Sequence, residues 1–246
     1  MNSLARPDLS LVFPVFDEED NIGQLLEQVL EIAPRLALDF EIVIVDDGSR
    51  DASAEVVEAI RNGEPRIRLL RHESNRGYGA ALRAGLREAR GELVFFSDAD
   101  LQFDLDELST LLHHAEKFDI VVGYRQPRRD PWGRRLLAAG WGWLVDTLFD
   151  LQVRDIDCAF KIFRRHVLEA IPIESVGAFV NTEILVRARQ KNFRIYQVPV
   201  THRRRRSGRQ SGANPGVILR ALLELASLYR ELRQPVAADA VQREEG

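Results

Sequence analysis

The chain has 246 residues, 45% hydrophobic and 29% charged, which is an ordinary globular composition and enough for one well-buried domain. A net charge of −4 argues against a general nucleic-acid binder, because such proteins carry a basic excess. The longest uncharged apolar run, residues 136–145, is far shorter than the ~20 residues that a membrane-spanning helix needs. The single cysteine, Cys158, excludes an internal disulfide and fits a reducing compartment.

The first half of the sequence alternates short apolar runs with segments of helical spacing. Apolar strands that alternate with helices predict an α/β fold with a mostly parallel central sheet, flanked by helices on both faces. In chain order we expect strands at 9–13, 41–45, 67–70, 93–96 and 120–122, and helices at 21–32, 52–60, 80–89 and 105–115.

The second half is less regular, and it ends in an amphipathic helix whose apolar stripe begins at Ile218. The residues after this helix, 234–246, are polar, so we expect a flexible tail behind a single domain of residues 1–233. The remaining expected elements are helices at 134–150, 182–189 and 215–232, and strands at 159–163 and 194–198.

Two aspartates, Asp98 and Asp100, directly follow the apolar run 93–96. Carboxylates one residue apart at a strand end can turn toward one point, and Mg²⁺ typically takes one or two protein carboxylates together with water and substrate phosphates. The pattern therefore suits a bound nucleoside diphosphate. Two aspartates that merely cap the next helix would give the same pattern.

A second acidic turn, Asp46-Asp47-Gly48-Ser49, also follows an apolar run. A carboxylate here can accept hydrogen bonds from a base N–H or a ribose hydroxyl. The alternative is a turn whose Ser49 or Asp51 caps the following helix. Two adjacent aspartates need donors or positive charge facing them, which favours a binding role.

Two further segments lie in turns of the predicted sheet, one after a strand and one before a helix. Residues 14–18 carry a third acidic turn, at the end of the first strand. Residues 75–81 carry two glycines before a helix, which suits either a phosphate site at the helix N-terminus or a simple turn with Arg76 in solvent. Ligands of open α/β sheets bind beyond the carboxyl ends of the strands, so the turns together favour a ligand site.

This ordered set of motifs resembles the family-2 glycosyltransferases, in particular the branch of dolichyl-phosphate and polyprenyl-phosphate mannosyltransferases. Phe16 and Asp17 depart from the Tyr and Asn that the family often has, and Phe103 stands where His is frequent. The matching segments are Pro14-x-x-x-Glu18, Asp46-Asp47-Gly48-Ser49, Asn75-x-Gly77-x-Gly79, Asp98-Ala99-Asp100-Leu101-Gln102, Gly123-x-Arg125, Asp157-Cys158-Ala159-Phe160-Lys161 and Asn181-Thr182-Glu183.

The resemblance implies a GT-A nucleotide-sugar-binding fold and sugar transfer that inverts the anomeric centre. It implies that Asp98, Asp100 and Gln102 surround a Mg²⁺ or Mn²⁺ ion that bridges the donor diphosphate. The residues that it places around the nucleotide sugar are Pro14, Phe16, Glu18, Asp46, Asp47 and Asp98, together with Arg203, Arg209 and Ser211 of a loop that closes over the diphosphate.

In this branch the acceptor is a lipid phosphate, which Arg125 and Arg134 would hold beside the sugar. Arginine suits phosphate because its planar fork binds two oxygens, although each arginine of such a run could simply be solvated. A phosphate acceptor is already anionic at neutral pH and needs no base. The expected catalytic residues are therefore Asp98, Asp100 and Arg125, and Asp100 or Glu183 could act as a base on a hydroxyl acceptor.

The sequence thus predicts a cytoplasmic transferase on the membrane surface, moving mannose from GDP-mannose onto polyprenyl phosphate. The helices at 134–150 and 215–232 are candidates for the bilayer interface, although both could simply pack on the domain, and a membrane-embedded partner protein would strengthen attachment. The alternatives are a UDP-sugar donor, with polyprenyl phosphate or a saccharide hydroxyl as acceptor, and a catalytically silent nucleotide-sugar-binding protein. A nucleic-acid partner is not expected.

Overall fold

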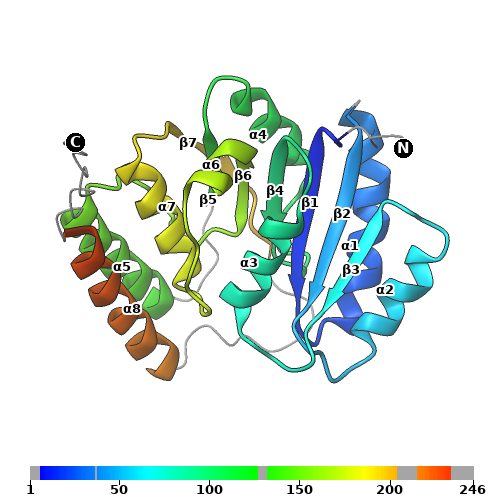
Figure 1. Ribbon diagram of the computed structural model, residues 1–246, viewed down its shortest axis with the longest axis horizontal. Helices are drawn as coiled ribbons and strands as arrows, with labels where there is room; N and C mark the ends of the chain where they lie inside the picture. Colours follow the sequence, from blue (N-terminus) through cyan, green and yellow to red (C-terminus); the bar gives the residue numbers. More distant parts are fainter. Residues whose placement is uncertain (1–5, 37, 127–131, 204–214, 234–246) are drawn as a thin grey trace, which may run out of the picture.

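The computed structural model describes residues 6–36, 38–126, 132–203 and 215–233 (Figure 1). Its centre is a seven-stranded sheet with the strand order β3-β2-β1-β4-β6-β5-β7. The strands are β1 (Leu9–Val15), β2 (Phe40–Asp46), β3 (Ile67–Arg71), β4 (Leu93–Ser97), β5 (Ile120–Arg125), β6 (Phe160–Arg164) and β7 (Ile195–Val200).

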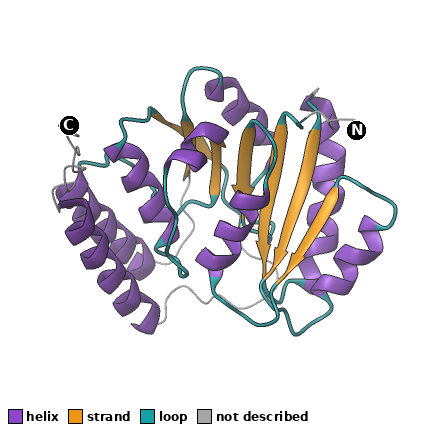
Figure 2. Ribbon diagram, in the orientation of Figure 1, coloured by secondary structure: helices purple, strands orange, loops and turns teal. Residues whose placement is uncertain are grey.

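Helices cover both faces of this sheet, and α5 and α8 lie together beside its β7 end (Figure 2). The α-helices are α1 (Glu19–Ile32), α2 (Ser53–Arg61), α3 (Tyr78–Glu88), α4 (Leu108–Ala115), α5 (Trp132–Phe149), α6 (Arg165–Ala170), α7 (Val180–Gln190) and α8 (Pro215–Arg233). The short 3₁₀ helices are η1 (Ala33–Leu36) and η2 (Leu105–Glu107).

The sheet is mostly parallel, as the sequence predicts. β1 runs parallel to β2 and β4, β2 to β3, and β5 to β7. The exception is β6, which is antiparallel to both β4 and β5. The carboxyl ends of β1, β2 and β4 therefore meet at one edge of the sheet.

The two central strands β1 and β2 read as continuous apolar runs because helices enclose both of their faces, and every residue in them is buried. One cluster of buried apolar side chains extends from Leu9 to Leu228. Within it the rings of Phe95 and Phe160 meet edge to face, with centroids 4.8 Å apart, and join β4 to β6. Each such buried aromatic side chain contributes about 1.5–3 kcal/mol.

Several element boundaries differ from the prediction. The first helix begins at Glu19, two residues earlier than expected, and the helix predicted at 105–115 divides into η2 and α4. Asp104 starts η2, because its side chain accepts the backbone N–H of Asp106. α6 was not predicted, and the proposed tail at 234–246 lies outside the described residues.

Candidate active site

The three acidic turns lie at one edge of the sheet. β1 and β2 pair in parallel as far as Val15 and Asp46, and β4 runs parallel to β1 and ends at Ser97. The topology therefore brings together the predicted site segments, whose individual roles stay predictions. These segments are residues 14–18, 46–49 and 98–102.

The turn after β1 and the turn after β2 are bound to each other. The backbone N–H of Asp17 donates to Ser49 Oγ at 3.0 Å, and Asp17 Oδ1 accepts the N–H of Arg50 at 2.8 Å. The backbone N–H of Glu18 donates to Ser53 Oγ at 2.8 Å. Ser49 thus ties two turns together and does not cap α2, whose N-cap position is Ala52.

Asp51 takes the capping role that the sequence left open between Ser49 and Asp51. Its Oδ1 accepts the backbone N–H of Ser53, in the first turn of α2, at 3.0 Å. The pKa of Asp51 is lowered because hydrogen bonds, the one from the Ser53 side chain first, outweigh the opposing effect of partial burial. Asp51, two residues after the second acidic turn ends, therefore stabilises the start of α2.

Pro14 and Phe16 differ in exposure although they are two residues apart. Pro14 lies buried in β1 opposite Val45 of β2. Phe16 lies just beyond the strand with 38% of its surface exposed. A partly exposed aromatic ring at a ligand-binding edge is suited to stacking on a nucleotide base. The place near the nucleotide expected for Pro14 stays a prediction.

Asp47 is held by the segment that precedes α3. Its Oδ1 accepts the backbone N–H of Arg76 at 2.9 Å and its Oδ2 accepts that of Gly77 at 2.8 Å. His72 Nδ1 lies 2.6 Å from the same Oδ1. The donors that the adjacent aspartates were expected to need are thus supplied by the protein itself, and Asp47 orders the β3–α3 turn.

Asp46 makes a different set of contacts. Its Oδ1 accepts the backbone N–H of Ser49 at 3.0 Å, and its Oδ2 lies 3.2 Å from Arg71 Nε. The Asp46 side chain is 1% exposed, whereas that of Arg71 is 51% exposed. A ligand that hydrogen-bonds to Asp46 would therefore share this carboxylate with Arg71.

The two glycines before and within α3 serve a close backbone contact. Gly77 has φ of 101°, which favours glycine, and a Cβ on it would overlap the carbonyl oxygen of Val176. A Cβ on Gly79 would lie 2.5 Å from the carbonyl oxygen of Gly177. Gly79 N–H donates to Val176 O at 3.0 Å. The spacing of these glycines is therefore explained by packing against the α6–α7 segment, and a phosphate role stays a prediction.

Asp98 and Asp100 lie in the turn after β4, and Leu101 between them and Gln102 has φ of 59°. Asp98 is partly exposed and Asp100 is 7% exposed, with its Oδ1 accepting the Gln102 N–H at 3.2 Å. No group of three or more histidine, cysteine or acidic residues suited to a metal occurs in the described part of the chain. Two carboxylates nevertheless fit Mg²⁺ or Mn²⁺, because substrate phosphates and water complete the shell.

Gln102 is engaged with the segment after β7. Its Nε2 donates to the carbonyl oxygen of Arg203 at 2.9 Å, and Arg203 N–H donates back to Gln102 O at 2.7 Å. The Arg203 guanidinium pairs with Asp104 at 2.5 Å. Gln102 therefore anchors the start of the loop that was predicted to close over the diphosphate. The other predicted residues of that loop, Arg209 and Ser211, lie outside the described residues.

A buried polar layer lies beside Asp98, and sequence reasoning gave its members no role. Lys161 of β6 is 1% exposed, and its Nζ donates to Asn181 Oδ1 at 2.8 Å and to the carbonyl oxygen of Cys158. Burial lowers the pKa of Lys161, and nearby acidic groups, Asp98 among them, oppose this. The sequence carries two signals of this layer: a lysine inside a largely apolar strand, and the presence of Lys161 and Asn181 in two of the motifs that resemble the family.

Tyr78, the first residue of α3, belongs to the same layer. Burial raises the pKa of Tyr78 well above its ordinary value, and the charge of the nearby Asp98 carboxylate raises it further. Its hydroxyl therefore stays protonated.

Arg125, predicted to bind the acceptor phosphate, is already paired within the protein. Its Nε and Nη2 donate to the two carboxylate oxygens of Asp155 at 2.7 and 2.8 Å, and its side chain is 8% exposed. Two parallel hydrogen bonds of this kind are strong and directional. An acceptor phosphate would have to share Arg125 with Asp155. The side chain of Arg134, the other predicted phosphate ligand, lies outside the described residues.

Glu183 does not suit the role of a base. Its carboxylate is 2% exposed and accepts the backbone N–H groups of Glu174 and Ser175, the latter at 2.8 Å. Arg187 Nε donates to it at 3.0 Å. These contacts hold the carboxylate in place, so Glu183 orders the segment before α7.

Comparisons with known proteins agree with this architecture. The model of the family "Glycosyl transferase family 2" matches residues 10–171. Undecaprenyl-phosphate 4-deoxy-4-formamido-L-arabinose transferase of Proteus mirabilis is 34% identical over 166 residues, which are 66% of this chain and 51% of that protein. The protein of the same description from Shewanella sediminis is 36% identical over 66% of this chain and 50% of its own length. The chain spans about half the length of these curated relatives.

The fold of this chain is similar to that of several solved structures. Mannosyl-3-phosphoglycerate synthase from Rubrobacter xylanophilus has a TM-score of 0.73 at 20% identity, over 93% of this chain and 76% of that one. Glucosyl-3-phosphoglycerate synthase from Mycobacterium tuberculosis, in complex with Mn²⁺, UDP and glucosyl-3-phosphoglycerate, has a TM-score of 0.64 at 21% identity, over 93% and 77%. The expected GT-A fold is confirmed. Because the family model covers 10–171 of the 246 residues, the chain belongs to glycosyl transferase family 2.

Proposed function

We propose that this chain transfers a sugar from a nucleoside-diphosphate sugar to a polyprenyl phosphate, with a divalent cation held by Asp98 and Asp100. The observation that carries the proposal is the position of these two carboxylates. They follow β4 at the edge where the acidic turns after β1 and β2 also lie. The curated relatives, whose names give undecaprenyl phosphate as the acceptor, support the choice of acceptor.

The proposed reaction needs one place for the diphosphate of the donor and another for the phosphate of the acceptor. A bound Mg²⁺ or Mn²⁺ would neutralise the diphosphate that leaves when the sugar is transferred. Asp98 and Asp100 would hold the ion, and the buried ammonium group of Lys161 interacts electrostatically with Asp98. The acceptor phosphate is already anionic, so no base is required, which agrees with the internal pairing of Glu183.

An exposed apolar surface supports a lipid acceptor. Of the seven large hydrophobic residues that are exposed in the described part of the chain, six lie on α5 and α8. The two helices contact each other through Phe149 and Tyr229, whose ring centroids are 5.8 Å apart. The six residues are Leu136, Leu137, Trp143, Leu219, Leu222 and Leu223.

We therefore infer that the α5–α8 surface, defined by these six residues, lies on the membrane that contains the lipid, at its cytoplasmic face. Such a surface gives reversible attachment of an interfacial kind. None of the described helices is both long and apolar enough to cross a bilayer. A membrane-embedded partner protein is a further proposal, and it would add to this weak attachment.

Mannose from GDP-mannose is the donor that we propose first, from the resemblance of the motifs to the mannosyltransferase branch. A UDP-sugar is the second candidate, with polyprenyl phosphate or a saccharide hydroxyl as acceptor. The names of the curated relatives add 4-deoxy-4-formamido-L-arabinose to the sugars to be tested. The partly exposed ring of Phe16 and the carboxylate of Asp46 are the described groups best placed to distinguish the bases.

The proposal is tested by a transfer assay with labelled GDP-mannose, UDP-glucose and nucleotide-activated 4-deoxy-4-formamido-L-arabinose. Each donor is incubated with the chain, polyprenyl phosphate and Mg²⁺, and lipid-linked label is extracted into organic solvent. Label in that phase that disappears with a chelator and in Asp98→Asn supports the proposal and identifies the sugar. Asp106→Asn is the matched control, because this exposed aspartate lies outside the candidate site.

Two other results would redirect the proposal. Label that remains aqueous on a saccharide would replace the lipid phosphate by a hydroxyl acceptor. Metal-dependent nucleotide binding without transfer to any acceptor would favour a catalytically silent binding protein.

A further inference from the structure

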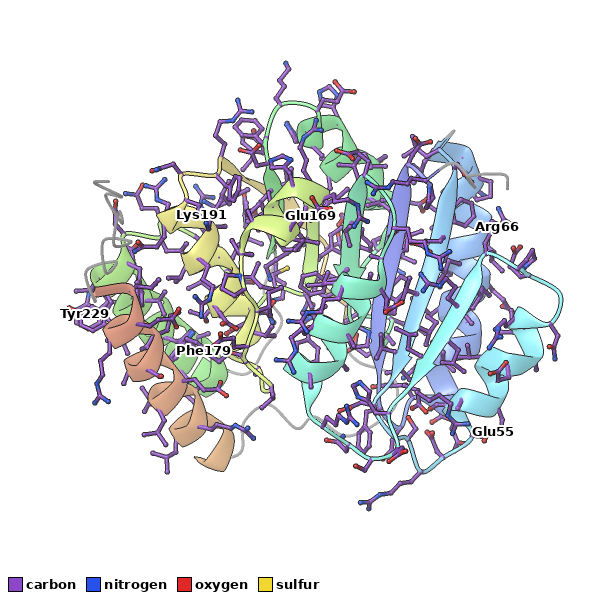
Figure 3. The ribbon with its side chains drawn as sticks, in the orientation of Figure 1. Glu55, Arg66, Glu169, Phe179, Lys191 and Tyr229 are labelled. Carbon is purple, nitrogen blue, oxygen red and sulfur yellow. The ribbon has the colours of Figure 1, made fainter. Side chains whose placement is uncertain are left out.

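A cavity of about 700 Å³ lies at the edge of the sheet where the strands begin, opposite the candidate active site. It is bordered by the residues at and before the starts of β1, β2 and β3 and by the end of α3, including Pro7, Phe40, Pro65 and Ala89. Figure 3 shows Arg66 at this end of the sheet and Glu55 of α2 near the other end. The volume is within the range of small-molecule sites.

The cavity is basic although the chain as a whole is acidic. Six arginines and three acidic residues line it, an excess of three positive charges, whereas the whole chain has a net charge of −4. Charges of one sign gathered around a depression attract small ions of the opposite sign. The six arginines are Arg6, Arg66, Arg68, Arg87, Arg90 and Arg165.

Two of the acidic residues are already neutralised by contacts within the wall. Glu41 accepts hydrogen bonds from Ser10 Oγ at 2.7 Å and from the backbone N–H of Arg90 at 2.5 Å, and it pairs with Arg68 at 3.0 Å. Glu88 pairs with the same guanidinium at 2.9 Å. These two carboxylates therefore cannot neutralise the other arginines of the cavity.

Two further arginines form a fixed part of the wall. Arg66 pairs with Glu64 at 2.6 Å, and its guanidinium lies over the ring of Phe40, 4.3 Å from the centroid. Arg165 donates to the carbonyl oxygens of Ala89 and Gly91, both at 2.8 Å. The wall is thus built from paired groups whose positions do not depend on a ligand.

Three arginines remain for a ligand. Among the described residues, the side chains of Arg6, Arg87 and Arg90 make no hydrogen bond or ion pair. They come from the segment before β1 and from the end of α3. Three guanidinium groups around one cavity match an anion with several oxygens, because each can bind two of them at once.

We propose that this arginine cavity binds a small anion that carries a diphosphate group. The ligand could be free pyrophosphate or a nucleoside diphosphate, and both present the same chemistry to Arg6, Arg87 and Arg90. The site is separate from the acidic edge of the sheet, and its arginines supply the positive charge that a divalent cation would supply there. The proposal does not depend on the transfer reaction.

The test is calorimetric titration of pyrophosphate, in a chelator, into the Asp98→Asn/Asp100→Asn chain, where the candidate metal site is disabled. We expect one binding site per chain. Neutralising all three arginines (Arg6→Gln, Arg87→Gln, Arg90→Gln) should weaken binding at least tenfold. The hydrogen bond from the backbone of Arg90 to Glu41 does not involve the substituted side chain.

A second triple variant, Arg35→Gln, Arg61→Gln and Arg230→Gln, is the matched control. It changes the net charge equally, at exposed positions outside the cavity. Equal weakening in both triple variants, or no saturable binding of pyrophosphate, would overturn the proposal. Titration of GDP and UDP into the same chain, with and without the three arginine substitutions, distinguishes the sources. Binding tighter than that of pyrophosphate that is lost with the three arginines assigns a nucleotide, and binding equal to that of pyrophosphate assigns the diphosphate alone.

Discussion

Lys161 Nζ donates a hydrogen bond to Asn181 Oδ1 at 2.8 Å and so connects β6 with the start of α7. Both side chains are buried, and the charge of the lysine interacts electrostatically with Asp98 in the turn after β4. A buried lysine is costly unless it is paired and hydrogen-bonded, so this contact is essential to the local fold.

Replacement of this lysine should therefore destabilise the protein. Lys161→Met keeps the aliphatic chain but leaves Asn181 Oδ1 and the Cys158 carbonyl oxygen without their donor. We expect the free energy of unfolding to fall by about 1–3 kcal/mol, because buried acceptors lose their partner. Urea denaturation measures this change, and Lys117→Met, at an exposed position, is the control. An unchanged stability would show that the ammonium group contributes nothing there.

Gly79→Ala should disturb the contact between the start of α3 and the α6–α7 segment. The new Cβ would lie 2.5 and 2.7 Å from the carbonyl oxygens of Gly177 and Ser175, which are backbone atoms and cannot rotate away. Overpacking of this kind costs about 1–3 kcal/mol. In Gly140→Ala the added Cβ meets no atom within 4 Å in α5, and this control should gain up to about 1 kcal/mol. Thermal or urea unfolding of both variants distinguishes them.

The ion pair Arg187–Glu183 should contribute far more to the free energy of unfolding than the neighbouring ion pair Arg187–Glu231. Arg187 and Glu183 are 5% and 2% exposed, whereas Glu231 is 48% exposed. Arg187→Met breaks both pairs and leaves the buried Glu183 carboxylate without its cation, so it should cost about 3–5 kcal/mol. Glu231→Gln should cost at most about 1 kcal/mol, because the pair is partly solvated. Similar losses in the two variants, measured by urea denaturation, would contradict this ranking.

Glu224 on α8 should make stability depend on pH. Burial raises the pKa of Glu224 above its ordinary value of 4.5, despite the opposing charge of Arg220, and one of its buried oxygens has no hydrogen-bond partner among the described residues. The folded state therefore binds the proton more tightly than the unfolded state. The stabilisation that comes from protonation of Glu224 is therefore fully present below pH 4.5, and it is lost as the pH rises through the folded-state pKa.

Glu224→Gln should accordingly be more stable than the unsubstituted chain at pH 7, and this advantage should disappear below pH 4.5. Urea denaturation at pH 4 and pH 7 provides the comparison. A Glu224→Gln chain that is less stable at pH 7 would mean that the ion pair with Arg220, at 3.4 Å, outweighs the cost of burial.

The sheet could be predicted from the sequence because its strands contain short apolar runs, and the parallel order of β1, β2 and β4 brings the acidic turns to one edge. The orientation of β6 could not, because a short apolar run carries no direction. α6, with six residues, is too short for a periodic pattern.

The internal partners of the site residues were also inaccessible. Asp47 contacts residues 25 to 30 positions further along the chain, and Arg125 pairs with Asp155, 30 positions away. Such pairings depend on how the turns pack. The sequence suggested substrate roles for Asp47, Arg125 and Glu183, and the fold adds an internal partner to each of them. The substrate roles of Asp47 and Arg125 stay predictions.

The central claim is that Asp98 and Asp100 hold the cation that binds the donor diphosphate. The most direct measurement is calorimetric titration of GDP and UDP into the chain with Mg²⁺ or Mn²⁺ and with a chelator, for the unsubstituted chain, Asp98→Asn and Asp106→Asn. We predict metal-dependent binding that Asp106→Asn keeps and Asp98→Asn weakens by at least tenfold. Binding that survives Asp98→Asn unchanged, or that needs no metal at this site, would contradict the account.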